Sequence, residues 1–119
     1  MNPHQVARFL PLTPVAFEIL LALAGGEAHG YAILQEIERR TEGRMSPHAG
    51  TLYRALARLV ADGLLEELDE RPEAGPGDER RRYYGLTDLG EAVAAGEARR
   101  LEDLVASARA RNLLAPGRA

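Results

Sequence analysis

Cysteine and tryptophan are both absent from this chain of 119 residues, and no long apolar run is present. Without cysteine, the chain forms neither a disulfide nor a cysteine-ligated metal site. The longest apolar run, Val15 to Ala24, is interrupted by Glu18, whereas a membrane span needs about 18 residues. The N-terminus has no basic region followed by an apolar stretch, so we expect no secretory signal and take the cytoplasm as the default location.

Lysine is also absent, because all 15 basic residues are arginine. The net charge of −3 taken alone disfavours a nucleic-acid partner, but the distribution of charge decides more than its sum. The planar fork of arginine can bond a phosphate or a guanine through two hydrogen bonds at once. The length of the chain suits one hydrophobic core and therefore one domain.

No group of residues predicts catalysis or metal binding. His4, His29 and His48 are scattered and form no pair at helical spacing, so we expect no metal. Ser46, the histidines and the aspartates form no recognisable pair of nucleophile and base. No glycine-rich loop is spaced to hold a phosphate. We therefore expect no enzyme activity and no cofactor.

The first half of the chain predicts two helices in front of a third. Thr13 and Pro14 are a helix-start signal for Pro14–Ala24, which is apolar on nearly all sides and therefore central. Residues 1–12 form either a short helix or an arm. His29 helps to start the next helix, from Gly30 to Glu42, whose inward stripe is expected to contain Tyr31, Ile33, Leu34 and Ile37. Gly43 is a candidate C-cap.

The segment from Ser46 to Leu65 predicts a helix with two different faces. Ser46 is the expected N-cap and Pro47 the first helical residue, with the helix ending at Asp62-Gly63. At about 100° per residue, one arc is apolar and faces the core: Ala49, Leu52, Tyr53, Leu56, Leu59 and Val60. The opposite side contains His48, Thr51, Arg54, Ala55, Arg58 and Asp62. Two helices joined by a short glycine-containing turn match helix-turn-helix spacing.

The outer face of this third helix is narrow and locally basic, which suits a DNA major groove. We expect Arg54 and Arg58 to contact phosphate or guanine, and Thr51 and His48 to contact a phosphate near the helix N-terminus. A solvated face with ordinary charges is the alternative. Tyr53 lies at the edge of the buried arc, where packing alone and a hydroxyl that reaches a phosphate are equally acceptable.

A two-stranded wing is expected after the third helix. Leu64 to Asp69 predicts one strand, the acidic stretch Glu70 to Glu79 a turn, and Arg80 to Leu86 the returning strand. We expect at least one of Arg80, Arg81 and Arg82 to reach a phosphate. The competing interpretation is a strand whose arginines pair with Glu66, Glu67 and Asp69.

The remaining residues predict one long helix, from Thr87 to Arg111, followed by a flexible tail at 112–119. Because the domain before it is already complete, this helix is expected to fold back over little of it. Its apolar residues recur at helical spacing and need a partner, most simply a second copy of the chain. The expected dimerisation residues are Leu89, Val93, Leu101, Leu104, Val105 and Ala108.

Four blocks of the sequence resemble the PadR family of bacterial transcriptional regulators. They are LTPVAFEILLAL, HGYAILQEI, GTLYRALARLVADGLL and RRRYYGLTDLGEA, spread over Leu12 to Leu104. The resemblance implies a dimeric winged helix-turn-helix protein, most often a repressor, that binds a palindromic operator. Short members of the family have a single C-terminal dimerisation helix, and some members respond to phenolic or hydrophobic compounds.

The expected fold is therefore mainly α with a small β wing: a DNA-binding domain at residues 1–86 and a dimerisation helix at 87–111. The expected partners are operator DNA, a second copy of the chain and a small hydrophobic effector. The effector would need a cavity between the final and N-terminal helices, lined by residues such as Phe9, Phe17 and Leu101. Another possibility is a winged helix that binds proteins and no DNA, which the acidic balance slightly favours.

Overall fold

The computed structural model describes residues 1–68 and 82–115, and in these ranges it contains five helices and three strands. In chain order they are α1 (Pro3–Ala7), α2 (Pro14–Ala24), β1 (Ala28–His29), α3 (Gly30–Arg40), α4 (Ala49–Ala61), β2 (Leu65–Leu68), β3 (Tyr83–Leu86) and α5 (Asp88–Ala110). This order is the winged helix-turn-helix arrangement that the sequence predicts. Within these ranges, no helix is long and apolar enough to cross a membrane.

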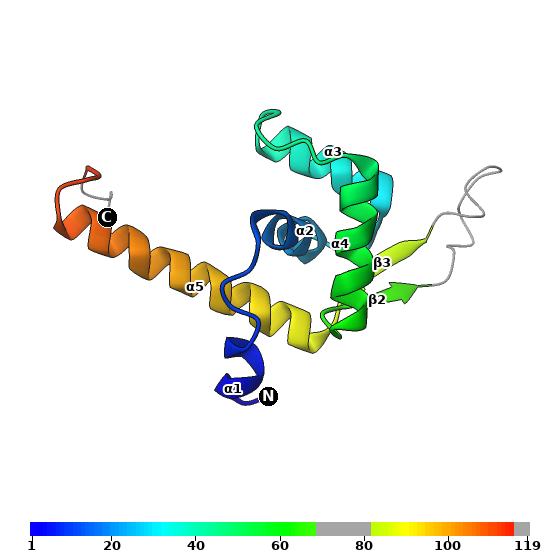
Figure 1. The fold of residues 1–119 in the computed structure, drawn as a ribbon, viewed down its shortest axis with the longest axis horizontal. Coiled ribbons are helices and arrows are strands. Elements are labelled where there is room, and N and C mark those ends of the chain that lie inside the picture. The colour runs from blue at the N-terminus through cyan, green and yellow to red at the C-terminus, as the bar shows by residue number, and fades with distance from the viewer. Residues whose placement is uncertain (69–81, 116–119) are drawn as a thin grey trace.

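Helix α2 occupies the centre of the molecule, between α3, α4 and α5 (Figure 1). It places Ile19, Leu20 and Leu23 in the core, where leucines of α4 and isoleucines of α3 meet them. The core also receives Val93 from α5 and Tyr84 from β3. Helices α2, α3 and α4 therefore build most of the core, but they do not complete it.

Three of the expected helix starts are present. The side chains of Thr13, His29 and Thr87 each accept a hydrogen bond from the backbone N–H three residues later. The expected cap at Ser46 is wrong, because α4 begins after His48, whose ψ of 151° keeps the chain extended. The hydroxyl of Thr41 accepts a hydrogen bond from the Met45 N–H at 3.1 Å, and this bond ties the end of α3 to the segment that precedes α4.

The wing is part of a sheet of three strands in the order β1-β3-β2. Both pairings are antiparallel, with Leu65 opposite Leu86 and Ala28 opposite Tyr84. The sequence predicts β2 and β3 but not β1, which is only two residues long. The expected wing turn, with Arg80 and Arg81, lies outside the described residues.

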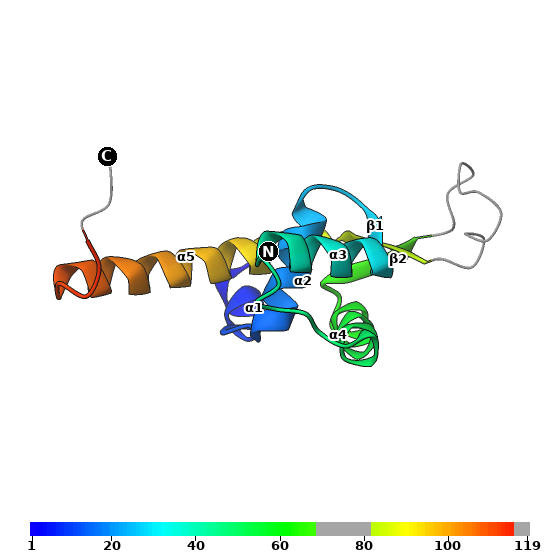
Figure 2. The same cartoon turned by 90° about the horizontal axis from the view of Figure 1, so that it is seen from above.

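Helix α5 has two unlike halves. Its first half packs against α1, α2 and β3, and Val93 is completely buried there. Its second half extends away from the domain, as Figures 1 and 2 show. The expectation that this helix folds back over little of the domain is therefore wrong for the first half. The reason is that α2 exposes more apolar surface than α3 and α4 cover.

The N-terminal residues form the short helix α1, which packs on α5. Asn2 and Gln5 form a reciprocal capping box at its start. Gly96 of α5 allows the close approach, because a Cβ there would lie 3.0 Å from Cγ1 of Val6. At the next position of α5, the side chain of Glu97 is buried and accepts two hydrogen bonds from Arg100.

Candidate nucleic-acid interface

Helices α3 and α4 are joined by the turn from Thr41 to His48. Glu42 and Gly43 both have positive φ, and the Gly43 N–H donates to the carbonyl of Glu38 at 2.8 Å. This arrangement reverses the chain within a few residues. Helix α4 then packs beside the start of α3, with one long side of α4 facing outward.

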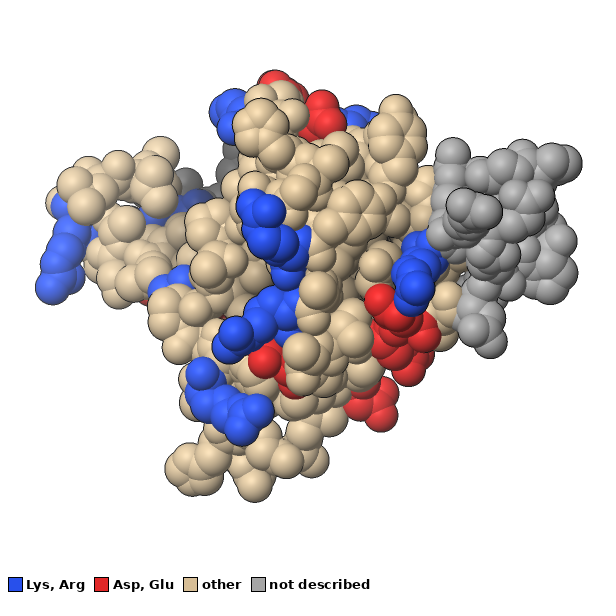
Figure 3. Space-filling view, turned by 45° about the vertical axis from the view of Figure 1, so that its right-hand side comes forward, with Lys and Arg blue, Asp and Glu red and all other residues tan. Residues whose placement is uncertain are grey.

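The outward side of α4 contains the predicted polar residues. Leu52, Leu56 and Leu59 are buried on the inner side, so Thr51, Arg54 and Arg58 point into solvent. Figure 3 shows arginine side chains in a row along this face. The structure therefore brings Thr51, Arg54 and Arg58 together as expected, and it leaves their face uncovered by any described element.

Arg54 and Arg58 differ in their partners. Nη2 of Arg54 lies 3.4 Å from the Thr51 hydroxyl, and no carboxylate in the described part of the chain pairs with it. Nε of Arg58 donates to Oδ2 of Asp62 at 3.2 Å, yet the Arg58 side chain is 80% exposed. Both guanidinium groups are thus accessible to a ligand. His48 is also exposed, at the N-cap position, without a side-chain capping bond.

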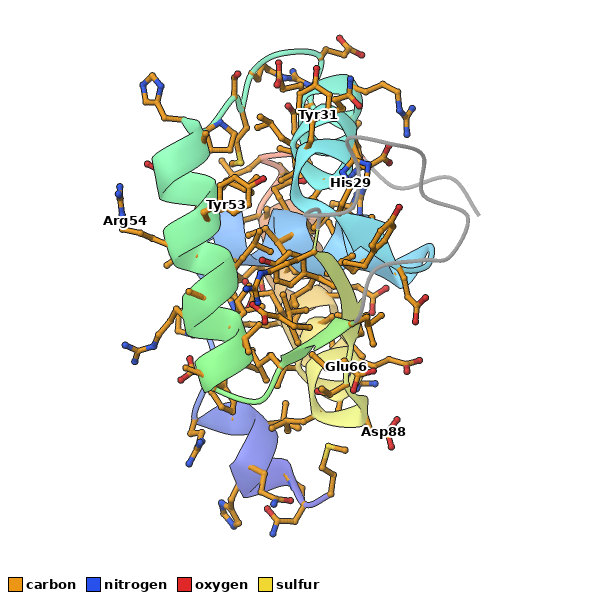
Figure 4. All side chains as sticks on the ribbon, turned by 90° about the vertical axis from the view of Figure 1, so that its right-hand side faces the viewer. His29, Tyr31, Tyr53, Arg54, Glu66 and Asp88 are labelled. Atoms are coloured by element: carbon orange, nitrogen blue, oxygen red, sulfur yellow. The ribbon has the colours of Figure 1, made fainter. Side chains whose placement is uncertain are left out.

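Tyr53 is not the core residue that the apolar arc predicts, since 49% of it is exposed. Its ring lies over the start of α3, where a Cβ on Gly30 would be 2.7 Å from both Cε1 and the hydroxyl oxygen of Tyr53. Figure 4 shows Tyr53 directed toward α3 while Arg54 points away from the body of the protein. Glycine at position 30 is therefore required for this placement.

A cavity of about 450 Å³ lies between α4, the start of α3 and the wing. We call it the tyrosine pocket, and its lining residues are His29, Gly30, Tyr31, Tyr53, Glu67, Arg82 and Tyr84. The sequence places Tyr31 on the inward stripe of α3, but the structure leaves 54% of it exposed at this pocket. In the sequence, the position of Tyr53 directly before Arg54 was the available signal for the exposure of Tyr53, because it places Tyr53 at the border of the outer face of α4.

Arg82, Glu67 and Tyr84 lie along the wing side of the tyrosine pocket. Nη1 of Arg82 donates to Oε2 of Glu67 at 2.9 Å. The Arg82 side chain is 69% exposed and the Glu67 side chain 41%. Burial, and then the nearby Glu67 carboxylate, raise the pKa of Tyr84 above its usual range. Of the three predicted wing arginines, Arg82 is described, and it forms the ion pair that the competing interpretation expects.

The expected dimerisation residues separate into two groups. Val93 belongs to the core of its own chain and Leu89 packs against that core, so the assignment of Val93 to an interface is wrong. Leu104 is 54% exposed, Val105 is exposed, and Leu101 and Ala108 are half-buried. These four residues lie on the half of α5 that extends from the domain.

The three residues expected to line an effector cavity do not come together. Phe9 lines a hollow of about 220 Å³ beside Arg58 and Leu59, and neither Phe17 nor Leu101 contributes to it. A second hollow, of about 400 Å³, does lie between α1 and α5, but its lining includes Val6, Leu10 and Gly96 instead. Within residues 1–68 and 82–115, no group of three histidines or carboxylates gathers to hold a metal.

The fold and the site together define a winged helix-turn-helix protein in which α4 has a basic outer face. The sequence profile of the Transcriptional regulator PadR-like family matches residues 19–96, which is more than half of the chain, so the chain belongs to this family. The family consists of transcriptional regulators, which assigns the chain to regulation and not to catalysis.

Two relatives share 41% identity with the chain. One is Transcriptional regulator Rv3488 of Mycobacterium tuberculosis, where the match covers 76% of this chain and 78% of that protein. The other is an uncharacterized 37.1 kDa protein of a Streptomyces fradiae transposon, where the match covers 67% of this chain but only 21% of that protein. The chain thus spans about a fifth of the second, longer relative.

Two solved structures establish the likeness of the fold. A PadR family regulator of Clostridium difficile has a TM-score of 0.69 at 21% identity, over 82% of this chain and 96% of that chain. Bacillus subtilis PadR, solved in complex with operator DNA, has a TM-score of 0.60 at 21% identity, over 71% of this chain and 46% of that chain.

Proposed function

We propose that this protein binds operator DNA as a homodimer and acts as a transcriptional repressor. The uncovered face of α4, with the accessible guanidinium groups of Arg54 and Arg58, is the observation on which the proposal rests. The solved complex of Bacillus subtilis PadR with operator DNA supports it, because that protein has the same fold. Such a protein works in the cytoplasm, where bacterial DNA lies.

Helix α4 would enter the major groove with its N-terminal half toward the bases. That groove is about 12 Å wide and admits one α-helix. Arg54 lies within the first two turns of α4, where side chains of recognition helices contact base edges. Arg54 therefore suits a two-bond contact to guanine, and Arg58, further along the helix, suits a phosphate or a neighbouring base.

The tyrosine pocket would hold the backbone strand that separates this major groove from the minor groove under the wing. Its position between α4 and β2–β3 is where that strand passes when α4 is in the groove. The hydroxyls of Tyr31 and Tyr53 and the guanidinium of Arg82 can donate to phosphate oxygens. Glu67 opposes this contact, so Arg82 must exchange a carboxylate partner for a phosphate.

The extended half of α5 would provide the dimer interface. Leu101, Leu104, Val105 and Ala108 occupy an arc of about 100° on it. Burial of their apolar surface against a second copy would remove it from water. Two α4 helices related by a two-fold axis would then bind a palindrome with half-sites about one helical turn apart. Each copy alone offers few contacts, and pairing combines them.

Occupation of the operator is the simplest mode of repression, since a bound dimer blocks access to the promoter. Release by a small hydrophobic effector would require a cavity that communicates with the dimer. The hollow between α1 and α5 suits this role better than the residues predicted from the sequence, because Ala92, Ala95 and Gly96 line it from α5. A thermal-shift screen of hydrophobic compounds would detect a ligand of the native state.

A winged helix that binds a protein partner without DNA is the second candidate. The net charge of −3 and the exposed carboxylates of Glu66 and Glu67 beside the wing favour it. A steep fall of DNA affinity with added salt is expected for the first candidate and not for the second, because phosphate contacts release counterions.

Selection of bound sequences from a pool of random duplexes tests the proposal. We expect enrichment of a palindrome whose half-site centres lie about 10 base pairs, or a multiple of this, apart. A pool that remains random after several rounds, with dimeric protein of native stability, would contradict DNA recognition. Enrichment of a single half-site would retain DNA binding but contradict the palindromic operator.

A further inference from the structure

We infer that Arg8 contacts a phosphodiester of the DNA backbone on the side of α4 that lies away from the wing. The contact rests on the proposed function, because it requires α4 to lie in the major groove. It adds a basic residue outside the helix-turn-helix and the wing to the DNA-binding surface. With it, each side of the groove that α4 occupies has its own backbone contact.

Arg8 lies next to the C-terminal end of α4 through its neighbour Phe9. Arg8 is the C-cap of α1, and Phe9 lines the same small hollow as Arg58, Leu59 and Asp62 of α4. Figures 1 and 4 both show α1 just beyond this end of α4. Arg8 thus lies close to the end of α4 that contains Arg58 and Asp62.

The Arg8 side chain is exposed and held in place without a carboxylate. Its Cζ lies over the ring of Phe9, 4.7 Å from the ring centre. In the described part of the chain no acidic group pairs with it, whereas Arg39, Arg40, Arg58, Arg82 and Arg100 all have carboxylate partners. Stacking on an aromatic face reduces the rotamer freedom that a contact would otherwise cost. Arg8 is therefore a partly ordered cation without a counter-charge among the residues that the structure describes.

The position of Arg8 relative to α4 indicates that its ligand is a phosphate and not a base. In helix-turn-helix proteins the N-terminal residues of the recognition helix contact base edges, so the bases lie closest to the first turns of α4. Arg8 lies beyond the opposite end, past Asp62, where the wall of the groove is the phosphodiester backbone. A contact there contributes affinity without sequence preference.

The test compares Arg8→Ala, Arg8→Lys and the control Arg39→Ala, whose arginine is paired with Glu36 on α3. Affinity for the selected operator and for an unrelated duplex is measured over a range of salt concentrations. We expect Arg8→Ala to lower both affinities by the same factor and to reduce the salt slope by about two units, one for each Arg8 of the bound dimer. Arg8→Lys should keep most of the slope, and the control should match the wild type.

Two controls and two possible outcomes separate this inference from the proposed function. Thermal unfolding and sedimentation show whether Arg8→Ala leaves the fold and the dimer intact, and Arg8→Lys reports on the charge alone if it does not. Wild-type affinity and slope for Arg8→Ala, together with weak binding by Arg54→Ala, would overturn the Arg8 contact and leave the proposed function standing. A loss confined to the operator duplex would also overturn it, because a phosphate contact acts on every sequence.

Discussion

Arg82, the residue before β3, and Glu67 of β2 form an ion pair of 2.9 Å across the wing, at the edge of the tyrosine pocket. The pair is largely exposed, so its own contribution to stability is small, about 0.2–1 kcal/mol. Glu67 nevertheless occupies the guanidinium that a DNA phosphate would use. If Arg82 contacts DNA as proposed, the pair limits DNA affinity more than it stabilises the fold.

Removal of the Glu67 charge should strengthen DNA binding. We expect Glu67→Gln to raise operator affinity by about two- to five-fold at low salt, since Arg82 is released and one repulsion is lost. Glu66→Gln is the matched control. This substitution removes the same charge from the opposite face of β2, away from the tyrosine pocket. Equal gains for both variants in fluorescence anisotropy would show a general charge effect and no role for the Arg82 pair.

The placement of Tyr53 over Gly30 should matter for the proposed phosphate contact in the tyrosine pocket. A Cβ at position 30 forces the Tyr53 ring to move, so we expect Gly30→Ala and Tyr53→Phe each to weaken binding by about 3- to 10-fold. Gly25→Ala serves as the control, because its Cβ would make only an ordinary contact of 3.9 Å with the Ala22 carbonyl oxygen, at an ordinary φ. Operator affinity unchanged in both variants would exclude the Tyr53 hydroxyl from the interface.

The extended half of α5 should control the oligomeric state. Leu104→Glu places a charge within the proposed apolar face, so we expect a monomer in sedimentation velocity and a large loss of operator affinity. Ala106→Glu adds the same charge about 200° around the helix and should leave the dimer intact. A Leu104→Glu variant that remains dimeric would show that the interface lies elsewhere on the chain.

Gly90 should be the glycine of α5 that tolerates least change. A Cβ at Gly90 would overlap the carbonyl oxygen of Leu64, a backbone atom in the tight connection before β2. A Cβ at Gly96 would meet only the side-chain tips of Val6 and Leu10. We expect Gly90→Ala to lower the free energy of unfolding by about 1–3 kcal/mol, despite the better helix propensity of alanine. Gly96→Ala should cost less, and the reverse order in denaturant unfolding would contradict the packing of α5.

Glu97 should make stability depend on acid pH. Hydrogen bonds from Arg100 hold the pKa of its buried carboxyl below the usual range, outweighing the opposite effect of burial. A carboxyl with a lowered folded pKa stabilises the protein above its unfolded pKa, about 4.3, and loses this effect as the pH falls through the folded value. Glu97→Gln should therefore be less stable at pH 7 and change less between pH 5 and pH 3. Parallel pH profiles for the two proteins would contradict this role.

The helices and the wing were predictable because local signals for them are strong. Thr13, His29 and Thr87 are caps, and the leucines of α4 recur at helical spacing toward one side. Ser46 misled the prediction for the opposite reason. Ser-Pro is a good start signal in isolation, but the Thr41 hydroxyl bonds the backbone at Met45 and the chain stays extended to His48.

Long-range packing accounts for the features that sequence patterns did not reveal. Tyr31 and Tyr53 have apolar periodicity, yet both line a pocket on the surface, where Gly30 lets the Tyr53 ring approach α3. Val93 has the same periodicity as Leu104, and only the position of α2 decides that one is buried and the other exposed. The strand β1 is too short for any periodic signal.

The salt dependence of DNA binding by the wild type and by Arg54→Ala tests the exposed face of α4 most directly. We expect wild-type affinity for the selected duplex to fall steeply with salt, and Arg54→Ala to bind about 5- to 150-fold more weakly with an unchanged melting temperature. Equal affinity of the two proteins at ordinary salt, or wild-type binding that is indifferent to salt, would contradict the assignment of this surface to DNA.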